Sequence, residues 1–455
     1  MIPALCIITL LAFCTILVLS RSILRKYDPR RQPVGIPAAL LSLWLVAVAV
    51  WGRYYYEIRI AGLMDFTIDR LLLLLVVLII VASLYAGKIS FRRHAAMEYL
   101  MLAFSLICLT SMLVHGFLPV LPEFPSPWNN FINGYLFPFV AFVFAKYCVE
   151  NERDLHLVFQ CVFFLGTYLA VISFFEFFNL HQFVFPRYIN NPEILIHIDR
   201  ARGPFLNAAF NGAAITFGFI CGAHLLAERK GFARLLYGGM LSLSFPAIFF
   251  TQTRSAYLGF LLALALLAAF YRTSFPKWKT FALPLALFAI FLLANIPRMA
   301  SQERKSGGVM QTEEIEIRTD LIRRSMSMMA ISPFSGIGLA QFLPVSSETF
   351  PGEAIASGFK ELQHFHILGM IVELGVFGSG VYLALVILVF RRLYRLKSVL
   401  PPAGFVSQNL LLTLAGIWLV YLATNLFLEP AYCLYFNAVP FVCAGFADGL
   451  HGRSV

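Results

Sequence analysis

The chain has 455 residues, of which 60% are hydrophobic and 13% are charged, and its net charge is +11. A mean hydropathy of +0.78 excludes a soluble globular protein. Uncharged runs of roughly 15 to 24 residues recur along the chain, as expected for helices that cross a bilayer, and none alternates as barrel strands do. We therefore predict an all-α, polytopic membrane bundle with about 12–14 transmembrane helices.

The apolar runs divide the chain into three parts. Residues 1–296 are expected to hold ten transmembrane helices, residues 297–366 a large outward loop with an amphipathic helix, and residues 367–455 the last three transmembrane helices. The first run lacks the basic start and small-residue cleavage site of a removable signal peptide. The expected spans are Ile2–Leu19, Ile36–Trp51, Leu71–Tyr85, Tyr99–Phe117, Phe131–Cys148, Leu157–Phe178, Gly212–Ala227, Leu236–Phe250, Ala256–Tyr271, Phe281–Ile296, Ile367–Phe390, Leu410–Leu428 and Ala431–Leu450.

Lys and Arg are concentrated in alternate connectors, those that follow the first, third, fifth, seventh, ninth and eleventh spans. The positive-inside rule places these connectors in the cytoplasm. The opposite connectors then face outward, among them the large loop and the polar insert Asn179–Asn211. The basic charge therefore indicates topology in a lipid bilayer and not a nucleic-acid partner.

The sequence offers no familiar cofactor site. No P-loop, GxGxxG turn, HExxH motif or Cys/His cluster occurs, and the outward loops lack an acidic pair that would hold a divalent cation. All eight cysteines fall within or at the ends of apolar runs, which favours small membrane-helix residues over disulfides or metal ligands. We expect no metal and no cofactor.

Arginines stand where outward connectors meet predicted spans, and guanidinium groups are suited to bidentate binding of phosphate. Arg254, in the sequence TQTRS, lies in a connector of about five polar residues, and a cation at the lipid boundary needs a partner. Arg202 precedes a span in the sequence RGPFLN, where Gly and Pro indicate a turn over the helix entrance. Arg200 can instead pair with Asp199, and any of these arginines can simply anchor the chain at headgroup level.

The large loop contains a basic stretch, Ile315 to Ile331, with helical periodicity. Arg318 recurs with Ile322, Met326 and Met329 at helical spacing, so we expect Arg318 on the buried face of this helix. A helix that rests on the bilayer and contacts lipid phosphate would show the same pattern.

Two histidines, His364 and His366, end the large loop just before apolar sequence resumes. A histidine can take a proton from a hydroxyl near neutral pH, as a general base does, although each can also be an ordinary interfacial residue. Glu373 follows inside an apolar run and needs a partner there, either an arginine or a helix end.

In this order, the fragments resemble the O-antigen ligase and polymerase family of bacterial envelope glycosyltransferases. The resemblance runs from about Arg200 to Gly378, and the first half of the chain agrees only in being a run of membrane helices. Phe365 stands where the family usually has Asn, and Ala208 where a Pro is common. The fragments that carry the resemblance are Arg202–Asn207, Thr253–Ser255, Arg318 before Ser332–Phe342, and His364 before Glu373–Gly378.

The resemblance implies a metal-independent, inverting transfer of a glycan from undecaprenyl pyrophosphate to a hydroxyl of a saccharide or glycolipid acceptor. It places the reaction at the periplasmic face of the bacterial inner membrane, in lipopolysaccharide or exopolysaccharide biosynthesis, with a chain-length regulator protein as a further partner. The histidine at position 364 would be the base, with His366 as its rival. Pyrophosphate would be bound by Arg202, Arg254 and Arg318, to which we add Arg200, with Glu373 and Asn207 in support.

Several functions stay open at this point. A polymerase of repeat units and a ligase of O-antigen to lipid A-core share the donor chemistry, and the stretch from Arg202 to Asn211 slightly favours polymerisation. A flippase or sugar-phosphate transporter would use the same arginines, but it needs polar residues along the spans and two similar halves, of which we find little sign. A scaffold without turnover is the third alternative.

Overall fold

The computed structural model describes residues 35–52, 55, 57–58, 66–87, 95–118, 126–149, 151–194, 197–270, 286, 289–290, 293–297, 312–350, 365–428 and 433–454. The predicted span Ile2–Leu19 and most of Phe281–Ile296 lie outside these residues. Within them the fold is helical, apart from one antiparallel pair of two-residue strands, β1 (Glu57–Ile58) and β2 (Phe66–Thr67). The predicted all-α class is confirmed.

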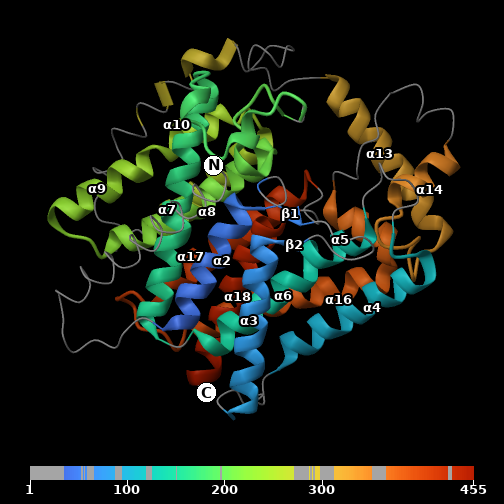
Figure 1. Cartoon of the computed structure of the whole chain (residues 1–455), viewed down its shortest axis with the longest axis horizontal. Helices are drawn as coiled ribbons and strands as arrows, with labels where there is room; N and C mark the ends of the chain where they lie inside the picture. The colour runs from blue at the N-terminus through green and yellow to red at the C-terminus, as the bar shows by residue number, and fades with distance from the viewer. Residues whose placement is uncertain are drawn as a thin grey trace.

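Among the described residues, seven helical segments are long and apolar enough to cross a membrane. Shorter apolar helices and two C-terminal helices pack beside them in one bundle (Figure 1). The seven segments are α3 (Ile68–Tyr85), α4 (Ala96–His115), α5 (Pro127–Phe131) continued by the π-helix η1 (Ile132–Leu136) and α6 (Phe137–Cys148), α7 (Glu152–Phe177), α8 (Ala208–Ala227), α9 (Gly231–Ser242) continued by α10 (Ser244–Phe250), and α16 (His366–Leu396). The other helices named below are α2 (Ile36–Val50), α11 (Arg254–Phe270), α13 (Thr312–Ile331), α14 (Phe342–Thr349), α17 (Gln408–Asn425) and α18 (Leu434–Ser454).

The helices run up and down between two ends of the bundle. Near the start of α4, Glu98 accepts hydrogen bonds from Lys146 and Tyr147 at the end of α6, and Lys146 also pairs with Asp448 near the end of α18, at 2.7 Å. On the same end, the Gly35 N–H before α2 donates to Asp154 at the start of α7, at 2.8 Å. The connectors that the sequence assigns to the outside therefore gather at the opposite end, which we call the site end.

Helix α8 is buried along its whole length and forms the centre of the bundle. It packs closely on α7 because two glycines face one another: a Cβ at Gly166 would lie 2.7 Å from the Cα of Gly218. Small residues at such a crossing allow two backbones to approach, as is common between membrane helices. Helix α9 projects on one side of the bundle, while α13 and α14 lie on the other side, near α16 and α4 (Figure 1).

Helix α16 is broken, which corrects the prediction of one continuous span from Ile367 to Phe390. Gly375 has φ 65° and ψ −174°, outside the helical region. The rings of His366 and Tyr382 are 5.9 Å apart, whereas sixteen residues of straight helix would separate them by about 24 Å. The first half of α16 therefore folds back along the second half.

The loop of residues 332–341 closes this break. At the end of the first half, the carbonyls of Val372 and Glu373 accept N–H groups from Ile337 and Gly338, each at 2.9 Å. At the start of the second half, the N–H of Val376 donates to the Pro333 carbonyl at 3.0 Å. Backbone groups that a helix end leaves without partners are thus satisfied inside the protein, as a membrane requires.

Glycines are required where the loop and the break meet. Gly336 has φ 76°, and a Cβ there would lie 2.3 Å from the backbone carbonyl of Glu373. A Cβ at Gly375 would lie 2.1 Å from the Phe334 carbonyl oxygen. Both approaches are closer than any side chain permits, so the Gly-rich turn is explained by contact with α16.

Candidate functional site

Arg254 is the first residue of α11, and the connector before it is held by its own side chains. The Thr253 hydroxyl donates to the Thr251 carbonyl at 2.8 Å, and the Thr251 hydroxyl donates to the Ile248 carbonyl at 2.7 Å. The Tyr257 hydroxyl reaches back to the Phe249 carbonyl at 3.0 Å. Arg254 is therefore placed at a fixed point at the positive end of the α11 dipole.

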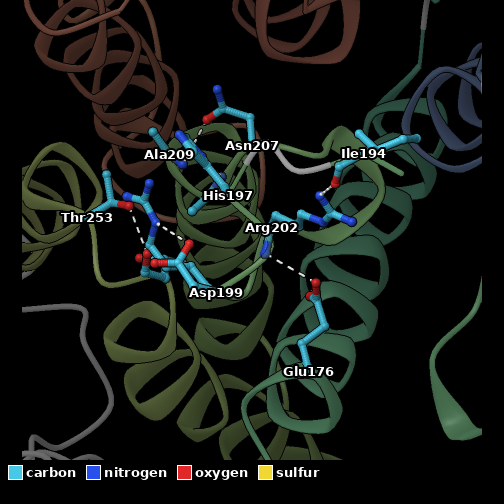
Figure 2. Close-up of polar contacts among 11 residues, drawn as sticks. Glu176, Ile194, His197, Asp199, Arg202, Asn207, Ala209 and Thr253 are labelled. Carbon is cyan, nitrogen blue, oxygen red and sulfur yellow. Dashed lines mark hydrogen bonds and ion pairs between the residues drawn. The ribbon is translucent and has the colours of Figure 1, made fainter. Parts of the chain in front are cut away.

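Arg202 is buried, and its guanidinium donates to backbone carbonyls of the loop before it. It contacts the Ile189 carbonyl through Nη2 at 2.6 Å and through Nε at 3.2 Å, and the Ile194 carbonyl through Nη1 at 2.5 Å. Its backbone N–H donates to Glu176 of α7 at 3.2 Å (Figure 2). In this conformation Arg202 shapes the loop of residues 189–194, which the sequence reading did not foresee.

Arg200 is also buried, and it pairs with Asp199 at 3.6 Å as the sequence suggested. Burial lowers the pKa of Arg200 below its ordinary value, while Asp199 and the phenol of Tyr257 act in the opposite direction. The N–H of Ala201 donates to the Phe250 carbonyl at 3.1 Å. The Arg200 loop therefore adjoins the connector that carries Arg254.

Asn207 caps α8. Its side-chain oxygen accepts the N–H groups of Ala209 and Phe210 at 3.0 and 3.3 Å, as an N-cap residue does. His197 adds a second cap because its Nδ1 accepts the Ala208 N–H at 3.0 Å. These bonds give Asn207 a structural role at the start of α8, and its supporting role in pyrophosphate binding stays a prediction.

Arg318 is partly buried in α13, and of its three predicted companions only Met329 packs against the buried cluster. Leu321, Ser325 and Met328 are buried, whereas Ile322 and Met326 are 37% and 55% exposed. The apolar residues of this helix form two neighbouring stripes, and contact with α14 and α16 buries the stripe that contains Leu321 and Met328. The Arg318 guanidinium carbon lies 5.8 Å from the ring centre of Phe427, just beyond α17, a cation–π contact.

The start of α11 and the end of α17 adjoin one another. A Cβ at Gly259 would lie 3.3 Å from Val420 and 3.9 Å from the Thr424 hydroxyl. Arg254 is five residues before Gly259 on one helix, and the Arg318 contact is three residues beyond Thr424 on the other. The two arginines are therefore brought to the same end of the same helix pair.

Of the two candidate histidines, His364 lies outside the described residues. His366 begins α16 and is buried, with its ring stacked on Tyr135 of η1 at 6.2 Å and edge-on to Tyr382. The Tyr382 and Tyr421 hydroxyls are 2.8 Å apart, and the Tyr421 hydroxyl donates to the Asn437 side chain at 3.2 Å. A buried polar chain thus links α16, α17 and α18 one turn below the end of α17.

This chain is not evident from the sequence, because its tyrosines and asparagine stand singly inside apolar runs. A single tyrosine in such a run is indistinguishable, from sequence, from an ordinary aromatic core residue. Their positions become informative only when the break in α16 brings three helices together.

Glu373 has a helix end as its partner, one of the two alternatives expected from the sequence. Its carboxylate accepts the N–H groups of Ala340 and Phe342 at 2.9 and 3.2 Å. Phe342 is the first residue of α14. Glu373 therefore ties the loop of residues 332–341 and α14 to the first half of α16.

Comparison with protein-family models finds a match over residues 239–383, to the family described as O-antigen ligase (Wzy_C). No match was found among curated proteins. The matched segment includes Arg254, Arg318, His366, Glu373 and the contact between the Gly-rich loop and Gly375, while α17 and α18 lie after it. The chain is thus a multi-pass membrane protein that carries an O-antigen ligase family domain over residues 239–383.

Proposed function

We propose that this protein transfers a glycan from undecaprenyl pyrophosphate to a hydroxyl of a saccharide or glycolipid. The acceptor makes it either a polymerase of lipid-linked repeat units or a ligase of O-antigen to lipid A-core. The observation that carries the proposal is that Arg254 and Arg318, both inside the matched family segment, reach the same end of the α11 and α17 pair. The reaction would occur at the periplasmic face of the bacterial inner membrane.

Pyrophosphate would be held by cationic groups at the site end. Arg254 and Arg318 are the proposed ligands, and Arg200 lies next to the connector of Arg254. The N-terminus of α11 adds partial positive charge at the same place. Arg202 would contribute by holding residues 189–194, which precede Arg200 in the same insert. Neutralising the charge that develops on the leaving pyrophosphate lowers the barrier to transfer, with no need for a metal ion.

A histidine would act as the base. It takes the proton of the acceptor hydroxyl while the oxygen bonds to the anomeric carbon of the donor sugar and the bond from that carbon to pyrophosphate breaks. Such a single displacement inverts the configuration at the anomeric carbon. His364 is the first candidate, and His366, held between Tyr135 and Tyr382, is the second.

The test uses purified protein, an undecaprenyl-pyrophosphate glycan and candidate acceptors, with product size read on a gel. Arg254→Ala should lower the transfer rate by about 10²-fold or more, as loss of a charge-stabilising donor does. Arg323→Ala removes an exposed arginine of α13 and is the matched control. His364→Ala and His366→Ala, tested separately, should identify the base by a loss of about 10²- to 10⁴-fold. Full transfer by the Arg254 variant would refute the proposal.

A lipid-linked oligosaccharide or sugar-phosphate transporter is the second candidate, because the chain of Tyr382, Tyr421 and Asn437 places polar groups inside the bundle. These groups hydrogen-bond to one another and are buried, which favours packing over a path for substrate. Protein in liposomes that moved the lipid-linked glycan across the bilayer without changing its length would support the transporter.

A further inference from the structure

The last turn of α17 contains two buried polar side chains whose oxygens lack hydrogen-bond partners. Among the residues that the structure describes, the Thr424 hydroxyl and the Asn425 side-chain oxygen accept or donate no hydrogen bond, and each residue is only 1% exposed. Buried polar atoms are nearly always paired. Thr413, earlier in the same helix, shows the usual solution, because its hydroxyl donates to the Asn409 carbonyl at 3.1 Å.

The place of this turn connects it with the proposed site. The Thr424 hydroxyl faces Gly259 of α11, the helix that begins with Arg254. Phe427, which carries the Arg318 contact, is one turn further on. Tyr421, one turn earlier, is bonded to Tyr382, against which the His366 ring packs. The end of α17 thus lies near α11, which begins with Arg254, near Arg318 of α13, and near the polar chain beside His366.

The chemistry of the two atoms selects the ligand. An amide oxygen only accepts hydrogen bonds, so it requires a donor. Ionised pyrophosphate has no donor to offer, whereas a sugar carries a hydroxyl on nearly every carbon. A threonine hydroxyl can serve a sugar hydroxyl in either direction.

We propose that Thr424 and Asn425 bind hydroxyl groups of the sugar that is attached directly to the pyrophosphate of the donor. The proposal rests on the proposed transfer function and adds to it a sugar-binding element outside the matched family segment. It also explains why α17 keeps two polar groups that weaken the fold when no substrate is bound.

The test compares Thr424→Val with Thr413→Val, two changes of the same shape in the same helix. Each purified protein is assayed for thermal unfolding and for binding of two probes, an undecaprenyl-pyrophosphate glycan and sugar-free undecaprenyl pyrophosphate. Thr424→Val should keep or raise the unfolding temperature, because a buried hydroxyl without a partner is replaced by a methyl group. Its affinity for the glycan should fall about three- to tenfold, and its affinity for the sugar-free lipid should not change. Thr413→Val should leave both affinities unchanged.

A second variant, Asn425→Leu, should show the same selective loss. Equal affinity of the Thr424 and wild-type proteins for the glycan would overturn the inference, and so would equal losses for both probes or a drop in unfolding temperature. If the wild-type protein transfers glycan and both variants bind the glycan as tightly as wild type, the sugar contact is refuted and the proposed transfer function stands. Wild-type protein that neither bound nor transferred the glycan would refute the proposed function, and this inference with it.

Discussion

Gly375→Ala tests the break in α16, on which the position of His366 depends. The residue adopts φ 65° and ψ −174°, a conformation that is essentially restricted to glycine. An added Cβ would also lie 2.1 Å from the Phe334 carbonyl oxygen. That oxygen accepts the Phe377 N–H at 3.3 Å, so it cannot move away without loss of a hydrogen bond at the start of the second half of α16.

The expected cost can be built from these contacts. A residue other than glycine in this conformation costs about 1–3 kcal/mol. Displacing the Phe334 carbonyl and its neighbour at Pro333 removes two backbone hydrogen bonds, each with a net value of about 1 kcal/mol. Together these losses amount to about 3–5 kcal/mol of folding free energy. Because the first half of α16 would no longer be held, glycan transfer should also fall.

The assay is thermal unfolding of purified protein in detergent, together with the rate of glycan transfer. Gly380→Ala is the matched control, because Gly380 lies in the same helix and an added Cβ there meets nothing within 4 Å. This control should unfold at the same temperature as wild type or slightly higher. Equal unfolding temperatures and equal rates for the two variants would refute the fold-back of α16 at Gly375.

Three further variants test other contacts. Glu373→Ala leaves the N–H groups of Ala340 and Phe342 without their acceptor, so the unfolding temperature should fall by the equivalent of about 2–4 kcal/mol. Limited proteolysis should also cut the loop of residues 332–341 faster, and an unchanged cleavage rate would contradict this. Lys146→Met removes the buried cation shared by Glu98 and Asp448, while Tyr147 still donates to Glu98 and Arg392 still pairs with Asp448 at 2.9 Å. The same unfolding assay should show a loss of about 3 kcal/mol, and a wild-type value would contradict this. Tyr421→Phe removes one hydroxyl from the buried chain and should cost about 1 kcal/mol of folding free energy. The transfer rate should also fall, because the chain packs beside His366, and an unchanged rate would contradict this.

Sequence periodicity and charge were sufficient for the helical class and for the grouping of connectors. The spans Leu71–Tyr85 and Leu157–Phe178 agree with α3 and α7 to within a few residues, because the bilayer imposes length and apolarity directly on such helices. The insert Asn179–Asn211 and the Arg254 connector, both predicted to face outward, meet at one end, as the alternation of basic connectors requires.

The rest depended on contacts between distant parts of the chain. Residues 367–390 are mostly apolar on both sides of Gly375, so their hydropathy does not mark the break. The break exists because the loop of residues 332–341 supplies hydrogen bonds to both sides of Gly375. The buried face of α13 was assigned to Ile322 and Met326, since α14 and α16 decide which of two apolar stripes is covered. The Arg202 contacts likewise depend on a loop whose course its sequence does not specify.

The break in α16 also changes how the membrane is crossed. Residues 376–396 form a helix about 31 Å long, which by itself matches the hydrocarbon thickness of about 30 Å. The nine residues from His366 to Leu374 therefore add no further crossing: they run from beside Tyr382 back to the Gly-rich loop at the break. These nine residues lengthen the apolar run in the sequence but do not carry the chain across the membrane. Cysteines placed along them should therefore react with the same side-specific reagent as cysteines in the Gly-rich loop.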